Sequence, residues 1–134
     1  MKRYLSLDIG DATIGIAVSD LLGLTAQGVE TIRRTELSAD LDRLAQLVQD
    51  YEPAGFVAGL PKHMNGDEGA RCDIVRAFMA EVAERFPTIE IHYWDERLST
   101  VAAARSLIAA DVSRKKRRKV IDKMAAVYIL QGFL

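Results

Sequence analysis

The chain has 134 residues, of which 49% are hydrophobic and 28% charged, and its 18 Lys and Arg against 19 Asp and Glu give a formal net charge of −1. This composition is typical of a folded globular domain and excludes a disordered or fibrous chain. A single cysteine excludes an intrachain disulfide, and two histidines leave few ligands for a zinc centre. Near-neutrality alone would disfavour a nucleic-acid partner.

The sequence has no segment that predicts a membrane span or an export signal. Its longest apolar run, residues 124–130, has seven residues, far fewer than a spanning helix needs. Asp8 and Asp11 interrupt the N-terminal stretch that could otherwise serve as the apolar region of a signal peptide. Together with the free Cys72, these features predict a single cytoplasmic domain over residues 1–134.

Three strands are predicted at the beginning of the chain. Alternating apolar residues predict strands over residues 4–9 and 14–18, and the short link between them predicts a hairpin. A weaker third strand over residues 24–32 follows a turn at residues 20–23.

Helices and strands are predicted to alternate over the rest of the chain. Leucines at helical spacing predict a helix over about residues 38–51, with Ser38 or Asp40 at its start. A buried strand, a second helix, a fifth strand and a third helix follow at residues 56–60, 74–86, 89–93 and about 99–110. A last helix follows a basic run. The order β-β-β-α-β-α-β-α-α predicts a three-layer α/β domain in which a mixed five-stranded sheet has helices on both faces.

Three acidic residues lie where a carboxylate is costly unless it has a partner or a function. Asp8 lies inside the first strand, on the side opposite Leu7 and Ile9, and Glu96 directly follows the fifth strand. Asp122 lies near the start of the last helix. If the first strand is central and the fifth runs parallel beside it, we expect all three acids to meet at one edge of the sheet.

Such a cluster predicts a metal site. Three close carboxylates repel one another, and a divalent cation removes that repulsion. Ligands that are all oxygen suit Mg²⁺ or Mn²⁺, and two such ions can activate a water and stabilise the leaving oxygen in phosphodiester cleavage. Each acid also has an ordinary structural explanation: Asp8 could accept turn amides, Glu96 could pair with Arg97, and Asp122 could be a favourable acid in the first turn of a helix.

The net charge hides a concentrated basic segment. Residues 114–123 contain seven bases and one acid, a net of +6, whereas residues 1–113 contain 11 bases and 18 acids, a net of −7. The run itself is Arg114, Lys115, Lys116, Arg117, Arg118 and Lys119. A block of like charges favours a flexible, solvated segment, which is either a solubilising loop or a clamp for a phosphate backbone next to Asp122.

The loop at residues 61–69 is the second candidate for binding. Glycines at both of its ends allow close approach of the backbone, and Lys62, Arg71 and Arg97 could contact phosphates. An ordinary loop between a strand and a helix explains the same residues. Met64 is interpreted as a packing residue in preference to a wedge between bases, and His63 as a loop residue.

Four segments in family order carry a resemblance to known proteins. They are LDIG (7–10) with IGIAVSD (14–20), GLP (59–61) with MNG (64–66) and Gly69, WDERLST (94–100), and DKMAA (122–126) leading to ILQGFL (129–134). With these motifs the sequence resembles the YqgF/RuvX family of Holliday-junction resolvases, also described as pre-16S rRNA nucleases. The resemblance implies an RNase H-like fold and a catalytic acidic triad at Asp8, Glu96 and Asp122. The family often has a basic residue at the position of Thr13.

The leading interpretation is a metal-dependent nuclease, expected to be an endonuclease, that processes the 5′ end of pre-16S rRNA or resolves Holliday junctions. The alternative is a factor of the same fold that binds nucleic acid or the ribosome without catalysis. A third is a nucleotide-binding module, since Asp8-x-Gly10 also resembles the phosphate loop of actin/Hsp70-type ATPases. Junction resolution requires two symmetric active sites, so it would favour a homodimer. No membrane partner is expected.

Overall fold

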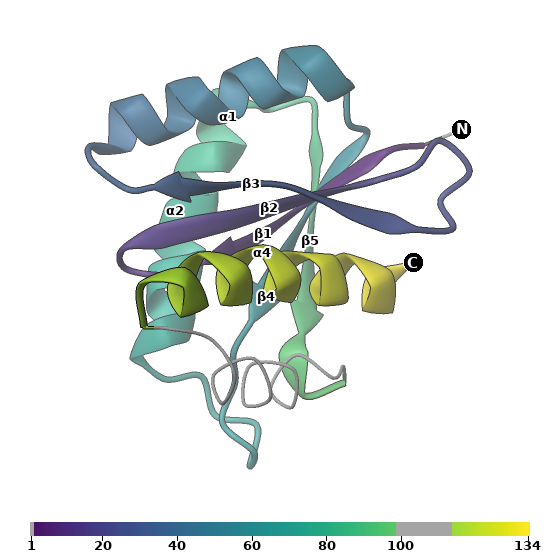
Figure 1. Ribbon diagram of the computed structural model, residues 1–134. Coiled ribbons are helices and arrows are strands. Elements are labelled where there is room, and N and C mark those ends of the chain that lie inside the picture. Colours follow the sequence, from purple (N-terminus) through teal and green to yellow (C-terminus); the bar gives the residue numbers. More distant parts are fainter. Residues whose placement is uncertain (1, 99–113) are drawn as a thin grey trace.

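The computed structural model describes residues 2–98 and 114–134, and the side chains of residues 114–122 lie outside this description. The sheet has the order β3-β2-β1-β4-β5, and β1 is antiparallel to β2 but parallel to β4 (Figure 1). The strands are β1 (Tyr4–Ile9), β2 (Thr13–Ser19), β3 (Ala26–Arg33), β4 (Gly55–Leu60) and β5 (Glu90–Asp95). The helices are α1 (Leu37–Tyr51), α2 (Ala70–Arg85) and α4 (Arg114–Phe133), and a short 3-10 turn, η1 (Glu96–Leu98), follows β5.

The predicted strand and helix order is confirmed over the described residues. The helix predicted at about residues 99–110 lies outside them. Within the described part of the chain, no helix is long and apolar enough to cross a membrane.

Side-chain alternation along β1 divides the core into two layers. Leu5, Leu7 and Ile9 are buried against α1 and α2, which cover one face of the sheet. Ser6 points to the other face, where its hydroxyl donates a hydrogen bond of 2.6 Å to the carbonyl of Ala126 in α4. Because the side-chain period of a strand is two, Asp8 shares this second face with Ser6.

Helix α4 crosses the sheet from β3 to β5. Residues three apart along the helix meet four of the five strands: Lys123 lies at Gly28 of β3, Ala126 at Ser6 of β1, Ile129 at Gly59 of β4 and Gly132 at Trp94 of β5. Three of these four contacts involve a glycine. The absence of a side chain on one partner lets the helix lie close to the sheet.

The start of α1 differs from its prediction. The helix begins at Leu37 with Glu36 as the N-cap residue, and no side chain caps it. Asp40 lies inside the helix and is buried, because its carboxylate pairs with Arg34 at 3.6 Å and accepts a hydrogen bond of 3.2 Å from the amide of Thr35. The partners of Asp40 thus come from the segment before the helix.

The start of α4 also differs. The basic run was predicted to be a flexible segment that precedes the last helix, whereas α4 begins at Arg114 and includes the whole run. Lys and Arg are good helix formers, and the later turns of the same helix are already held against the sheet. Adding the basic residues to this existing helix costs less free energy than starting a separate helix would. No acidic residue lies in the first turn of α4, which removes the interpretation of Asp122 as a first-turn acid.

We expect Gly59→Ala to lower the free energy of unfolding by about 1–3 kcal/mol, the usual cost of overpacking a core. A Cβ at Gly59 would lie 3.0 Å from Cγ1 of Ile129, which is fully buried and has no room to move. Urea denaturation followed by circular dichroism measures this loss.

Gly28→Ala is the matched control at the same interface. The three atoms nearest to a Cβ there would all be side-chain carbons of Lys123, an exposed and flexible neighbour. The control should therefore cost clearly less, and equal losses in the two variants would contradict the close-packing argument.

Candidate active site

The carboxyl ends of the parallel strands β1, β4 and β5 meet at one edge of the sheet. The β1–β2 turn, the loop at residues 61–69 and η1 all begin at this edge, because each follows one of these strands. Crevices outside the carboxyl ends of parallel strands are the usual location of ligand sites in α/β sheets. The predicted acids Asp8 and Glu96 both lie near this edge.

Asp8 is a buried carboxylate on the central strand. Only 6% of its surface is exposed, and it lies near the carboxyl end of β1 on the face that α4 covers. Its partner on β2 is Gly15. On β4, the pairing of Leu7 with Ala58 places Gly59 next to Asp8. The residue beside Asp8 is therefore a glycine on both neighbouring strands, so neither strand places a side chain directly beside the Asp8 carboxylate on this face.

Glu96 reaches the same face from η1, which directly follows β5. The expectation that β5 lies directly beside β1 is wrong, since β4 lies between them. Because Gly59 of β4 has no side chain, the Glu96 carboxylate can lie over β4 and approach β1. Its Oε2 lies 3.3 Å from the position that a Cβ of residue 59 would occupy. Glu96 is 8% exposed, so its carboxylate is buried against β4, next to the strand that contains Asp8.

The direction of α4 places the backbone of Asp122 at the same end of the sheet. Gln131 contacts the start of β3 through a hydrogen bond from the amide of Ala26, and Lys123 lies farther along β3 at Gly28. Helix α4 therefore runs opposite to β3, which is parallel to β1 because both are antiparallel to β2.

Ala126 of α4 lies against Ser6 of β1. Because α4 and β1 run in opposite directions, the backbone of Asp122, one turn before Ala126, lies toward the Asp8 end of β1. The side chain of Asp122 lies outside the described residues, so the predicted triad stays a prediction. Among the described side chains, no three His, Cys, Asp or Glu residues form a group that could hold a metal ion. A three-carboxylate site at this edge needs an acid from outside the described side chains, which is where Asp122 lies.

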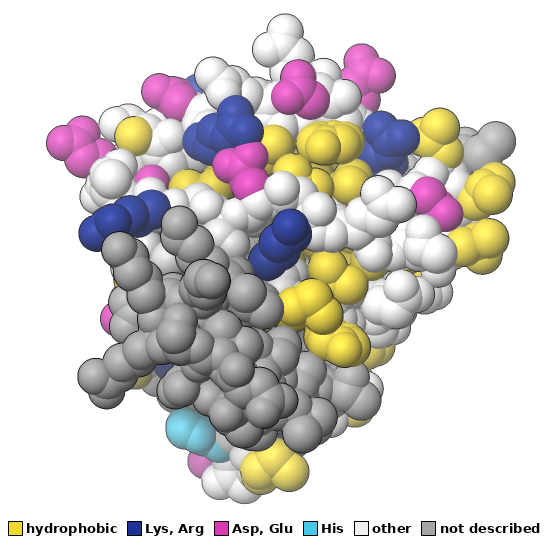
Figure 2. Space-filling model, in the orientation of Figure 1, with side chains coloured by type: hydrophobic (Ala, Val, Ile, Leu, Met, Phe, Trp, Pro, Cys, Tyr) yellow, Lys and Arg dark blue, Asp and Glu magenta, His cyan; other side chains and the backbone are white. Residues whose placement is uncertain are grey.

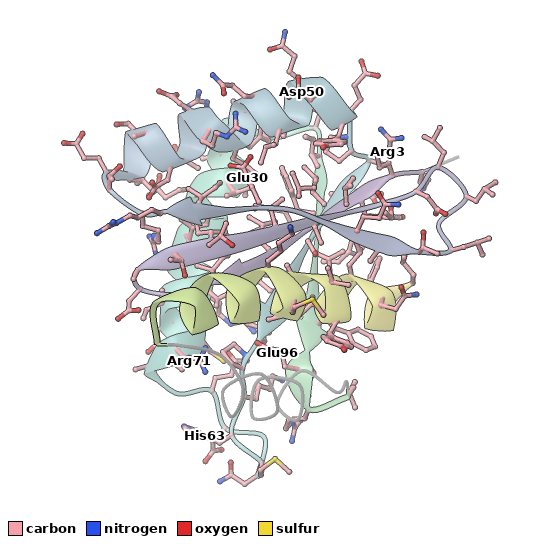
Figure 3. All side chains as sticks on the ribbon, viewed as in Figure 1. Arg3, Glu30, Asp50, His63, Arg71 and Glu96 are labelled. Atoms are coloured by element: carbon pink, nitrogen blue, oxygen red, sulfur yellow. The ribbon has the colours of Figure 1, made fainter. Side chains whose placement is uncertain are left out.

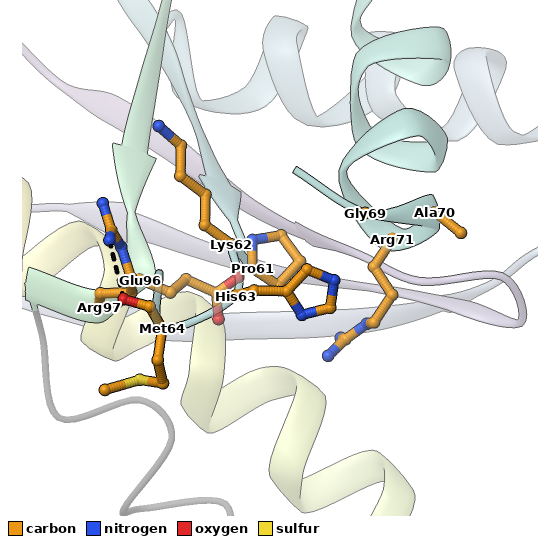
Figure 4. A pocket seen from close by; sticks show the side chains of 9 residues that line it. All are labelled: Pro61, Lys62, His63, Met64, Gly69, Ala70, Arg71, Glu96 and Arg97. Atoms are coloured by element: carbon orange, nitrogen blue, oxygen red, sulfur yellow. Dashed lines mark hydrogen bonds between the residues drawn. The ribbon is translucent and has the colours of Figure 1, made fainter. Parts of the chain in front are cut away.

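A cavity of about 680 Å³ opens in front of Glu96 (Figure 4). It is lined by the loop at residues 61–69, the start of α2 and η1. A second cavity of about 340 Å³ is lined by the β1–β2 turn together with Arg71 and Ile74. Arg71 borders both cavities, is exposed and makes no ion pair with any described residue. Figure 3 shows Arg71 and Glu96 at the same edge of the sheet, below α4.

The other basic residues predicted to bind nucleic acid have different surroundings. Arg97 donates hydrogen bonds of 2.6–3.1 Å to the Asp95 carboxylate and one of 3.3 Å to the carbonyl of Met64. The bond to Asp95 raises the pKa of Arg97, and Arg97 lowers the pKa of Asp95. Lys62 lies 4.0 Å from Glu68. Arg97 therefore orders the site, and Arg71 is better placed to contact a ligand.

Met64 does not pack as predicted. It is 88% exposed at the tip of the loop. The loop turns back on itself at Gly66, where φ is +95°, and the tip residue is left outside the turn. The sequence motif does not reveal this exposure, because it depends on where the turn directs the side chain.

Arg34 was missed by the sequence analysis. It follows β3 and holds the β1–β2 turn, because its guanidinium donates a hydrogen bond of 2.7 Å to the carbonyl of Gly10 and its amide one of 2.9 Å to that of Ala12. The buried Asp40 and the ring of Phe78, 5.1 Å away, complete its surroundings. The turn begins two residues after Asp8, so Arg34 anchors the backbone next to this carboxylate.

Comparison with known proteins decides the family. The sequence model described as "RuvX: Holliday junction resolvase" matches residues 2–134. The chain belongs to the RuvX family. A "Putative pre-16S rRNA nuclease" of Heliobacterium modesticaldum is 54% identical over 132 residues, covering 98% of this chain and 88% of that protein. The protein of the same name from Clostridioides difficile is 53% identical and covers 98% and 93%.

Solved structures confirm the RNase H-like architecture of this RuvX protein. T. thermophilus RuvC in complex with a Holliday junction substrate has a TM-score of 0.64 at 10% identity, covering 97% of this chain and 91% of that one. Thermus thermophilus RuvC has a TM-score of 0.58 at 11% identity, covering 96% and 92%. The family membership confirms the nuclease class expected from the sequence motifs.

We expect Arg34→Ala to lower the free energy of unfolding of the RuvX protein by about 1.5–3 kcal/mol, the range for hydrogen bonds of charged groups. The variant leaves the buried Asp40 carboxylate without its guanidinium and the carbonyl of Gly10 without its side-chain donor. Urea denaturation measures the change.

Arg33→Ala, a substitution of the exposed preceding residue, is the control and should be close to neutral. Equal stability of the two variants would show that Arg34 does not anchor the turn.

Proposed function

We propose that this RuvX protein is a divalent-metal-dependent endonuclease that hydrolyses phosphodiesters in structured nucleic acid, with Asp8, Glu96 and Asp122 as its catalytic residues. One observation carries the proposal: two buried carboxylates from separate elements, Asp8 of β1 and Glu96 of η1, lie on one face of the sheet, and Glu96 lines a cavity. A bound divalent cation would attract both carboxylates and offset the cost of burying their charges. The path of α4 brings the backbone of Asp122 to the same edge.

The donor set fits Mg²⁺ or Mn²⁺. Asp8 and Glu96 provide only oxygen ligands, and Asp122 would add a third carboxylate. Hard divalent cations prefer such ligands and keep several waters, which a cavity in front of Glu96 can accommodate. Two ions held there would supply an activated water and charge stabilisation for the leaving oxygen. The chain itself would fix the three carboxylates on separate elements and position the strand to be cut.

Basic residues at the starts of α2 and α4 support binding of a phosphate backbone. Arg71 lies in the first turn of α2, where its charge adds to the positive end of the helix dipole. The six bases of residues 114–119 occupy the first turns of α4, where positive charge opposes the helix dipole. A polyanion bound beside them would relieve this unfavourable arrangement. The proposed contacts are sequence-independent, as expected for phosphate binding.

We propose the precursor of 16S rRNA, cut near its 5′ end, as the substrate. Relatives more than half identical over nearly the whole chain have names that refer to this precursor. RuvC resembles this chain in fold at 10% identity, which does not transfer its substrate. A precursor-rRNA substrate would place the protein in the cytoplasm, in contact with assembling ribosomes, and one active site would suffice. Resolution of a Holliday junction would instead require a homodimer, which a mass measurement in solution detects.

We expect Asp8→Asn to reduce Mn²⁺- or Mg²⁺-dependent cleavage at least a hundredfold while binding persists, because the amide keeps the shape and removes the charge. Cleavage of a 16S rRNA precursor and of a four-way DNA junction, each with metal and with EDTA, measures the effect. Asp50→Asn, on α1 at the far side of the molecule, is the control and should retain activity (Figure 3).

Wild-type cleavage rates in Asp8→Asn would contradict the triad. Binding without cleavage in the unaltered protein would favour the non-catalytic alternative. Affinity for ATP without affinity for nucleic acid would favour the nucleotide-binding module.

We expect replacement of all six bases of residues 114–119 by Gln to weaken binding for every nucleic-acid sequence alike. The slope of log K against log salt should fall by up to about 5, since each neutralised phosphate of a duplex contributes roughly 0.9. Titrations at several salt concentrations measure the slope. Arg85→Gln, at the other end of α2, is the control. An unchanged slope would make the run a solubilising segment.

A further inference from the structure

The loop at residues 61–69 presents one apolar side chain to solvent. Met64 is 88% exposed, the highest value among the exposed large hydrophobic residues of the described chain. Exposed apolar side chains that stand alone are common and require no explanation. Met64 differs because of the way its loop is held and because of what surrounds it.

Hydrogen bonds within the loop hold its tip in one conformation. The amide of His63 donates to the carbonyl of Asp67, and the amide of Gly66 donates to that of His63, both at 2.9 Å. Asn65 bridges to Asp67 through two further bonds of 2.9 and 3.0 Å. A loop ordered in this way can hold an apolar side chain in water without folding it back onto the protein.

Arg97 ties this tip to the candidate active site. Its guanidinium donates a hydrogen bond to the carbonyl of Met64, and Asp95 fixes the orientation of the guanidinium from the residue before Glu96 (Figure 4). The position of Met64 is therefore coupled to the position of Glu96. Met64 and Glu96 line the same cavity, whose rim also carries Lys62 and Arg71.

We propose that Met64 is a wedge that inserts between bases where the regular stack of a bound nucleic acid is interrupted, at a branch or at the end of a helix. The inference rests on the proposed function, because it places the scissile strand in the cavity beside Glu96. Apolar side chains, Met among them, are used to separate base steps, and a thioether contacts aromatic faces favourably. The cations on the rim would hold the flanking phosphates. The loop would then select substrates by their structure.

Fluorescence of 2-aminopurine tests the wedge directly, because this base becomes brighter when it unstacks. One probe is a four-way DNA junction labelled at the branch; the other is an RNA helix with a single-stranded 5′ extension, labelled at its last base pair. A continuous duplex labelled at its centre is the third. The protein is used as the full chain in an Asp8→Asn background, so that the probes stay uncut.

Binding of the Asp8→Asn protein should raise the fluorescence of at least one interrupted probe. Adding Met64→Ala should abolish most of this rise and weaken binding to that probe about tenfold, with little change for the continuous duplex. Met64→Leu should retain the rise. Leu22→Ala removes a side chain that is 67% exposed in the β2–β3 turn and should change nothing. This turn lies at the opposite end of the sheet, where Figure 2 shows hydrophobic side chains at the surface. A response of only the DNA or only the RNA probe supports the wedge and identifies the substrate.

An unchanged fluorescence rise and affinity in Met64→Ala would overturn the wedge and leave the proposed nuclease function intact. Equal losses in Met64→Ala and Leu22→Ala would also overturn it. If the parent protein binds none of the three probes, the proposed function fails, and the wedge fails with it.

Discussion

The close approach of α4 to the sheet is the constraint on which the candidate site depends. It is most severe at Gly59, where a single missing side chain has two consequences. Ile129 packs into the space that a Cβ would fill, and the carboxylate of Glu96 lies over the same point of β4. Without this gap, β4 would separate Glu96 from Asp8, and the helix that contains Asp122 would lie farther from the sheet. The packing of α4 on the sheet and the position of the proposed catalytic carboxylates therefore both depend on Gly59 in this RuvX protein.

Two arginines position the backbone around the carboxylates. Arg34 holds the turn that follows Asp8, and Arg97 joins the segment around Glu96 to the loop at residues 61–69. Each is itself oriented by an acid, Asp40 or Asp95. A guanidinium can satisfy a carboxylate and a carbonyl at once because its donors point in several directions. Such residues look like binding residues in a sequence, yet their hydrogen bonds are already used within the protein.

Strand periodicity predicted the face on which Asp8 lies, because the alternation of Leu7, Asp8 and Ile9 depends only on local geometry. The expectation that β5 runs directly beside β1 had no local pattern behind it and was wrong, since the order of parallel strands depends on how the crossovers pack. The basic run was predicted to be flexible from charge repulsion, whereas continuity with the buried turns of α4 outweighs that repulsion. Exposure of Met64 and the anchoring role of Arg34 both require contacts between distant segments.

The sequence by itself determined the elements, the face of each strand, the family motifs and the three acids proposed for catalysis, because these follow from short-range periodicity and from residue chemistry. Only the tertiary structure decided the strand order, the diagonal path of α4 and the gap at Gly59 through which Glu96 approaches the central strand. It also decided which cations are paired and which, like Arg71, face a cavity. These features arise from packing between segments that are far apart in the chain, which depends on the combined shapes of several side chains and not on any one short stretch of sequence.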